Sequence, residues 1–185
     1  MKDIATEVNK LLKSYLEGNK KNAYSKLKKI SKAYPTNEKL KFNLAFMEQD
    51  QGDINSAKKS YIELINEFNN FNSKINLYNI LLREKNYYKS LELINNILNT
   101  NKDLTKVWID KAYIYYKINE YNSSKNICYS ILEKQNDNIK ALNLIGLCFF
   151  KEKKYEDSLN YLLQGLKINN QDISILNSLG EIYFE

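Results

Sequence analysis

Few residues of this chain could carry out chemistry. Its 185 residues include no histidine, so neither a Ser-His-Asp triad nor a cysteine–histidine pair can form. The sequence also lacks a glycine-rich loop of the kind that binds phosphate groups. Acidic pairs such as Glu156 and Asp157 stand at an expected helix start, where carboxylates interact favourably with the helix dipole. We therefore expect no catalytic residue and a chain that is not an enzyme on its own.

The sequence also offers little for a metal ion. Cys128 and Cys148 are its two cysteines, and they lie twenty residues apart. A structural zinc site takes four cysteine or histidine ligands at characteristic spacings, which this pair does not supply. Both cysteines fall on helix faces that should be packed, where a free thiol behaves as a small hydrophobic group. We expect two buried thiols, no metal site and no cofactor.

The elements that position these residues follow a repeat. A small residue recurs at spacings of 34, 33, 34 and 34 residues: Ala23, Ala57, Ser90, Ser124 and Ser158. Such a period is typical of a solenoid, in which one repeat cannot bury its apolar face alone. Within residues 105–118, apolar residues recur at three- and four-residue steps, which indicates an amphipathic helix. A break at residues 119–122 and a second helical pattern follow, so each period predicts a helical hairpin.

Further positions within the period carry recurring residue types. Counted from residue 105, positions 4, 8, 11 and 20 are Trp108, Ala112, Tyr115 and Ser124. The next repeat gives Ile145, Gly146, Phe149 and Ser158, and the pattern resumes at Leu179, Gly180 and Tyr183. In these residues the chain resembles the tetratricopeptide-repeat (TPR) family. The resemblance implies an all-α fold, a right-handed α-solenoid of stacked antiparallel helix hairpins.

The resemblance also implies a domain organisation, a single TPR array over residues 1–185. Its repeats span residues 4–37, 38–70, 71–104, 105–138 and 139–172. Residues 173–185 would form the first helix of a sixth unit, left either by a truncation or as a capping helix.

In this family the first helix of each hairpin lines a concave groove, which implies a set of peptide-groove residues. Asn9, Asn43 and Asn76 share one groove position and resemble the asparagine ladder of O-linked N-acetylglucosamine transferase repeats. A side-chain amide has two donors and an acceptor, so it can pair with a peptide backbone. Other groove positions carry Asn79, Tyr113, Tyr116 and Phe150. These aromatic residues could anchor a partner or pack between neighbouring helices.

A second known TPR groove binds the C-terminal carboxylate of heat-shock chaperones. It needs lysine, asparagine and arginine at fixed positions of three successive repeats. Here the corresponding positions carry Ile75 and Asn79, then Asp110, then Lys140 and Leu144. We therefore do not expect a chaperone C-terminal carboxylate as the ligand.

The net charge of +6 is unevenly distributed. Residues 1–41 hold eleven lysines and four acidic residues. The expected second helix of the first repeat carries a candidate basic patch: Lys20, Lys21, Lys26, Lys28, Lys29 and Lys32. This patch could bind nucleic acid or anionic lipid, or it could be the polar outer face that a terminal repeat needs for solubility. Lysine outnumbers arginine 27 to one, which argues against a nucleic-acid partner, because base and phosphate recognition favours arginine.

Three functions remain open at this stage. We expect a non-catalytic protein–protein interaction module that binds a peptide segment or helix of a partner in its concave groove. The chain could instead be the N-terminal TPR arm of a larger glycosyl- or sulfotransferase that recruits a protein substrate. A third alternative is a basic adaptor associated with nucleic acid or a membrane. No run of 18 apolar residues and no apolar signal core are present, so we expect no transmembrane segment and a cytoplasmic location. The sequence does not indicate an oligomeric state.

Overall fold

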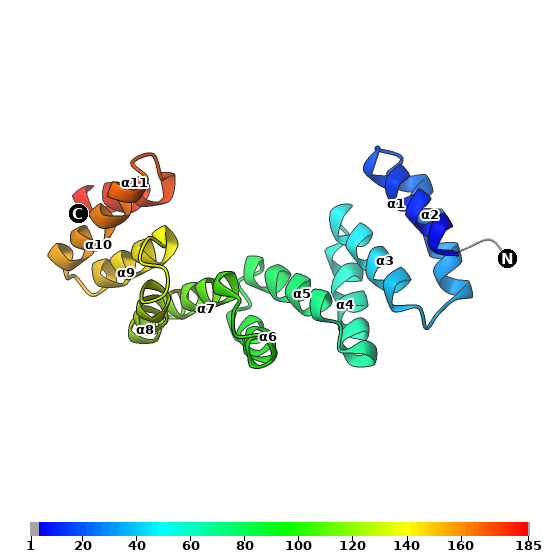
Figure 1. Cartoon of the computed structure of the whole chain (residues 1–185), viewed down its shortest axis with the longest axis horizontal. Helices are drawn as coiled ribbons and strands as arrows, with labels where there is room; N and C mark the ends of the chain where they lie inside the picture. Colours follow the sequence, from blue (N-terminus) through cyan, green and yellow to red (C-terminus); the bar gives the residue numbers. More distant parts are fainter. Residues whose placement is uncertain (1–3, 185) are drawn as a thin grey trace. The chain divides into compact units, whose positions relative to one another are not determined.

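The computed structural model describes residues 4–184, which form eleven α-helices and no β-strand (Figure 1). The helices are α1 (Ile4–Leu16), α2 (Lys20–Ala33), α3 (Glu38–Asp50), α4 (Ile54–Phe68), α5 (Phe71–Arg83), α6 (Tyr87–Thr100), α7 (Thr105–Lys117), α8 (Tyr121–Leu132), α9 (Ile139–Lys151), α10 (Tyr155–Ile168) and α11 (Ile173–Phe184). The all-α fold of helical hairpins predicted from the repeat is confirmed. Among residues 4–184, no helix combines the length and the apolarity that crossing a membrane requires.

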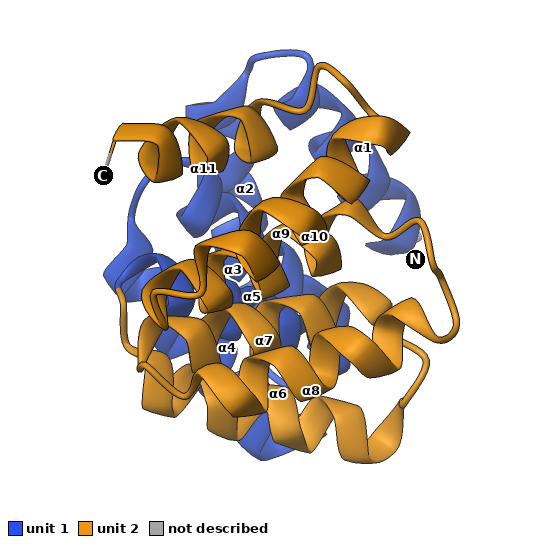
Figure 2. Ribbon diagram, turned by 90° about the vertical axis from the view of Figure 1, so that its left-hand side faces the viewer, with its two compact units in different colours: residues 1–84 blue, residues 85–185 orange. Residues whose placement is uncertain are grey.

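The chain divides into two compact units, residues 1–84 and residues 85–185, which Figure 2 shows in separate colours. Unit 1 contains α1 to α5 and unit 2 contains α6 to α11. Within each unit, every helix packs against the next helix in the sequence. In unit 2, α9 also packs against both α7 and α11, so these three first helices form a layer.

The small residues of the repeat are all buried, with at most 2% of their surface exposed. The contact between α9 and α10 shows why they must be small. Ser158 Oγ on α10 donates a hydrogen bond to the Gly146 carbonyl on α9 over 2.7 Å. Two helices whose backbone and short side chains meet in this way leave no room for a larger residue.

Apolar residues around these contacts form the core of each unit. In unit 1 the buried cluster contains Val8, Tyr15, Ala23, Leu27, Leu40 and Met47. In unit 2 one cluster contains Ile109, Ala112, Cys128, Ile131, Ala141, Leu144 and Ile145. A second cluster contains Phe150, Leu162, Ile175, Leu179 and Ile182. On their helices these residues recur at steps of three, four or seven residues, which is the amphipathic pattern read from the sequence.

Asparagine and aspartate residues fix the starts of most first helices. The side chains of Asn37, Asn70, Asn138 and Asp172 accept hydrogen bonds from the backbone N–H groups of Leu40, Ser73, Ala141 and Ile175, at distances of 2.7 to 3.1 Å. Each bond satisfies one of the N–H groups that the first turn of a helix leaves without a partner. Each capping residue is the last residue of an expected repeat, so the caps mark where hairpins begin.

The turns inside the hairpins share one backbone conformation. Lys85, Asn119 and Lys153 have φ angles of 59°, 66° and 61°, and Gly18 and Gly52 occupy the same place in their hairpins with φ of 102° and 85°. This left-handed region is easily reached by glycine and tolerated by asparagine, but it costs other residues roughly 1–2 kcal/mol. The backbone is therefore strained at Lys85 and Lys153, whereas the same conformation costs less at Asn119.

We expect the Lys153→Gly variant to be more stable than the parent by about 0.5–1 kcal/mol, because glycine removes that strain. Urea unfolding followed by circular dichroism measures the difference. Lys29→Gly, an exposed substitution inside α2, is the control and should instead lower stability by about 0.5–1 kcal/mol. A Lys153→Gly protein less stable than its parent would show that this turn stores no strain.

Candidate functional site

Unit 1 carries the four candidate asparagines on three first helices. Asn9 on α1 is exposed, whereas Asn43 on α3 is partly buried. The Nδ2 atom of Asn43 is buried and has no hydrogen-bond partner among the residues that the structure describes. A buried amide donor without a partner costs free energy, so a carbonyl group that reached it would be bound favourably.

The two asparagines of α5 are already engaged within unit 1. Asn76 Nδ2 donates to Tyr61 Oη over 3.0 Å, and Tyr61 Oη donates to Gln49 Oε1 over 2.9 Å. Tyr61 is fully buried, and this burial raises its pKa to about 12. Asn79 Nδ2 donates to the Ile75 carbonyl of its own helix over 2.9 Å. A side-chain amide with one hydrogen bond can still form others, but both residues have a structural role that the ladder pattern did not indicate.

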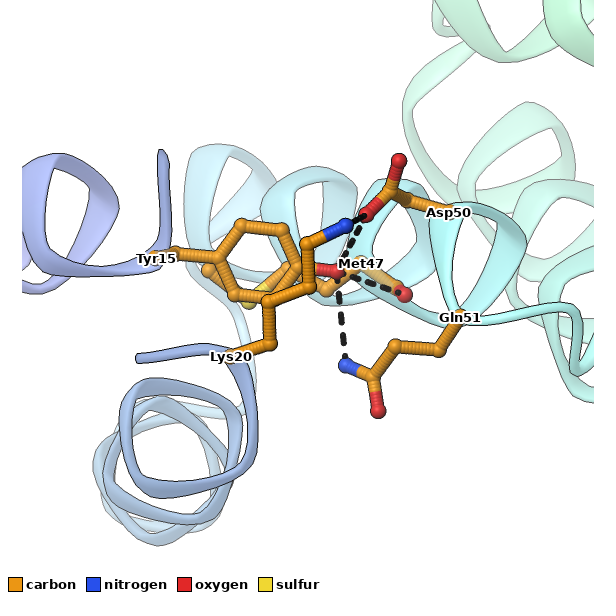
Figure 3. A network of polar contacts seen from close by, with 5 residues as sticks. All are labelled: Tyr15, Lys20, Met47, Asp50 and Gln51. Atoms are coloured by element: carbon orange, nitrogen blue, oxygen red, sulfur yellow. Dashed lines mark hydrogen bonds and ion pairs between the residues drawn. The ribbon is translucent and has the colours of Figure 1, made fainter. Parts of the chain in front are cut away.

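Figure 3 shows a polar network in unit 1 that the sequence analysis missed. Tyr15 is buried at the end of α1, and its Oη donates to Asp50 Oδ2 over 2.8 Å. Gln51 Nε2 donates to Tyr15 Oη over 3.4 Å. Lys20 Nζ donates to the same Asp50 oxygen over 2.7 Å. The hydrogen bonds from Lys20 and Tyr15 lower the pKa of Asp50, so the carboxylate stays ionised and links α1 and α2 to α3.

Lys20 differs from the other lysines of the basic patch, because its charge is paired with Asp50. Lys21, Lys26, Lys28, Lys29 and Lys32 lie exposed on α2. Among them, Lys28 Nζ donates to Tyr24 Oη over 3.3 Å. The remaining lysines form an exposed, positively charged side of one helix, which suits either a solvated surface or a weak anion contact.

Unit 2 carries the candidate aromatic residues. Tyr113 and Tyr116 on α7 are partly buried, with ring centroids 6.5 Å apart. Lys117 Nζ lies 5.2 Å from the Tyr113 centroid and 5.3 Å from the Tyr116 centroid, within the range of cation–π attraction. Burial raises the pKa of Tyr116 to about 12, so its hydroxyl group stays protonated at neutral pH. The two rings and one ammonium group thus form a fixed amphipathic surface.

The other candidate aromatic residue, Phe150, lies on α9, which packs against α11. On α11, Ser178 Oγ donates to Asn143 Oδ1 of α9 over 2.9 Å, which ties the two helices together. Phe150 of α9 differs from the tyrosines, because only 6% of its surface is exposed. It packs in the cluster with Leu162 and Ile175, so α10 and α11 cover it. Its position therefore favours packing over partner contact.

The two thiols lie where the repeat pattern placed them. Cys128 and Cys148 are free and fully buried, as expected from the sequence. Burial raises the pKa of Cys128 to about 12, and it raises that of Cys148 as well. Residues 4–184 contain no group of three or more cysteine, aspartate or glutamate side chains that could hold a metal ion.

No protein-family model matches the sequence, and no curated protein matches it. Solved structures do match the fold. A tetratricopeptide-repeat protein from Parabacteroides merdae ATCC 43184 is 18% identical, with 96% of this chain and 71% of that chain covered and a TM-score of 0.87. MamA from residue 41 to its end, from Desulfovibrio magneticus RS-1, is 14% identical over 93% and 99% of the chains, with a TM-score of 0.80.

A third solved structure is YrrB, described as a TPR protein with an unusual peptide-binding site. It is 11% identical over 94% of this chain and 90% of that chain, with a TM-score of 0.79. At these identities the likeness defines the architecture. The chain has the tetratricopeptide-repeat fold, as the resemblance in its sequence implied.

Proposed function

We propose that this chain is a non-catalytic protein-interaction module that binds a peptide segment or helix of another protein along the first helices of its hairpins. The observation that carries the proposal is the aromatic surface of α7 in unit 2, where Tyr113 and Tyr116 are held beside Lys117. Rings that are already packed on one side lose little conformational freedom on binding, and they are frequent anchors of interfaces. YrrB, a structure of the same fold, is described by its peptide-binding site, which supports a peptide as ligand.

The asparagines of unit 1 supply a second type of contact. Asn9 is exposed and Asn43 holds a buried donor without a partner among the described residues. A peptide carbonyl is an acceptor that would satisfy such a donor. We infer that the asparagines of unit 1 favour contacts to a peptide backbone, whereas the aromatic residues of unit 2 favour contacts to apolar side chains. Phe150 is left out of the proposed surface because it is buried.

The experiment is selection of binding peptides from a displayed library of random twelve-residue sequences, with the full chain as bait. The peptide selected is then measured by calorimetry against variants. Tyr113→Ala should weaken binding by at least about tenfold, because truncating an aromatic anchor costs more than 1 kcal/mol. Lys28→Ala, an exposed residue of the basic patch, should change the affinity less than about twofold at physiological salt.

Each variant is first shown to fold by circular dichroism, because Tyr113 packs against the core of unit 2. Tyr88→Ala, at a tyrosine that is 75% exposed on α6, controls for loss of a tyrosine as such. The proposal is rejected if Lys28→Ala weakens binding more than Tyr113→Ala and the affinity falls steeply as salt increases. The binding surface would then be formed by the lysines of α2.

A further inference from the structure

A cavity of about 630 Å³ lies in unit 2, away from Tyr113 and Tyr116. It is bordered by the loop between α6 and α7, the first turns of α7, and one side of α8 with the turn that follows it. This volume is within the range of about 300–1,000 Å³ that ligand sites in proteins occupy. The cavity shares no residue with the surface proposed above, so the two sites can be tested independently.

The apolar wall of the cavity is formed by Trp108, Ile127 and Ile131. The Trp108 ring is fixed in place, because its Nε1–H group donates to the Lys102 carbonyl over 2.9 Å. Lys111 Nζ, which does not border the cavity, lies 5.1 Å from the indole centroid. An aromatic ring held by two contacts needs little reorganisation to receive an apolar side chain.

The polar residues of the cavity follow α8 in a row. Asn126, Ser130 and Lys134 are exposed and stand four residues apart. Four residues of α-helix rise about 6 Å, and Glu133 continues the helical conformation past the end of α8. Two residues of an extended peptide span roughly 6.6 Å, so an extended segment lying along α8 would meet this row once every second residue.

The charges around the cavity are mainly positive. Lys102 and Lys134 border it, and Lys111 lies close to the indole ring. Asp103 is the acidic residue among those that border it. Carboxylates are the groups that such an arrangement attracts, and it would repel lysine and arginine side chains.

We propose that this cavity binds an extended segment of a partner protein in which one bulky apolar side chain is flanked by acidic residues. The apolar side chain lies against Trp108, Ile127 and Ile131. The flanking carboxylates pair with Lys102 and Lys134, and the peptide backbone runs along the polar row of α8.

Trp108 is the only tryptophan of the chain, so its fluorescence reports on the cavity itself. The probe is the synthetic peptide acetyl-Asp-Glu-Phe-Glu-Asp-amide, which contains no tryptophan or tyrosine. Its addition should change the Trp108 emission in a saturable manner. Two control peptides should leave the emission unchanged. Acetyl-Asp-Glu-Gly-Glu-Asp-amide lacks the apolar anchor, and acetyl-Lys-Lys-Phe-Lys-Lys-amide lacks the acidic flanks.

Lys134→Glu and Ser130→Glu should each lower the affinity for the acidic peptide by about tenfold, because each places a negative charge beside the flanking carboxylates. Both positions are exposed, so the variants should fold. Lys59→Glu, an equal charge change at an exposed position of α4, should leave the affinity unaltered.

The proposal fails if the acidic peptide leaves the emission unchanged, if the basic peptide binds as tightly, or if Lys134→Glu binds like the parent. It also fails if the emission shifts with protein concentration alone, because the occupant would then be a second copy of this chain.

Discussion

Replacing Glu152 with alanine is expected to lower the free energy of unfolding by about 3 kcal/mol at pH 7. Glu152 Oε1 lies 2.6 Å from Lys125 Nζ, and the two side chains are only 18% and 9% exposed. Lys125 Nζ also lies 4.4 Å from the centroid of the Phe149 ring. Removing the carboxylate would leave an ammonium group buried without its counter-charge, which is among the most destabilising single changes.

The chain supplies its own control at an equivalent place two repeats earlier. Lys58 Nζ and Glu84 Oε1 form the same type of pair in unit 1 over 2.7 Å, but these side chains are 26% and 39% exposed. Glu84→Ala should therefore cost less than about 1 kcal/mol, because water solvates the remaining lysine. A double variant, Lys125→Met with Glu152→Leu, should be more stable than Glu152→Ala alone, since it removes both charges.

The Glu152 pair also makes stability depend on pH. Burial pushes the pKa of Glu152 upwards, but the hydrogen bond from Lys125 and the ion pair with Lys154 outweigh it and hold the pKa below its ordinary value of 4.5. The stabilisation is therefore complete above pH 4.5 and is lost as the pH falls through the lower folded-state value. Urea unfolding at pH 7 and pH 3 should show the difference between parent and Glu152→Ala shrinking in acid. If the difference in unfolding free energy were the same at pH 7 and pH 3, the Glu152–Lys125 pair would not be the source of the pH dependence.

The second large effect is expected at Gly146, where Gly146→Ala should destabilise the protein by about 1–2 kcal/mol. A Cβ atom there would lie 2.7 Å from Leu162 Cγ and 3.3 Å from the Ser158 carbonyl oxygen. Leu162 is fully buried, so it cannot move aside without disturbing its own packing. The better helix propensity of alanine offsets only part of this cost.

Gly180 is the matched control, because it occupies the same position in the next first helix, α11. A Cβ atom at Gly180 meets nothing within 4 Å. Gly180→Ala should therefore stabilise α11 by up to about 1 kcal/mol through helix propensity alone. Thermal unfolding of both variants should give melting temperatures that shift in opposite directions. Shifts of the same sign would contradict the role given to the α9–α10 contact.

The helical hairpins could be predicted because the residues that determine them are local and periodic. Ser124 and Ser158 recur at one spacing, and a turn residue such as Asn119 carries its own preference for the left-handed conformation. The side chain of Asn138 caps α9, which is a local signal of a helix start that the sequence analysis did not use. Signals of this kind need no knowledge of distant parts of the chain.

The candidate surfaces were less predictable because they depend on contacts between residues that are distant in the sequence. Asn76 has the residue type of a groove ladder, yet its partner Tyr61 lies on the preceding helix. The sequence position of Phe150 is compatible with both exposure and packing, and it is the contact with residues such as Ile175 of α11 that buries it. The Tyr15–Asp50 bond joins residues 35 positions apart, close to one repeat length. A search for polar pairs separated by one period could have found this bond.

Within each unit, the packing of each helix against the next helix in the sequence has a consequence for biosynthesis. Proteins dominated by such local contacts fold in microseconds to milliseconds. A ribosome adds roughly 5–20 residues per second, so synthesis of residues 85–185 takes several seconds. Residues 1–84, whose five helices pack mainly on one another, can therefore complete their core soon after leaving the ribosome, while the rest is still being translated. Half-made chains would then expose little apolar surface to aggregation.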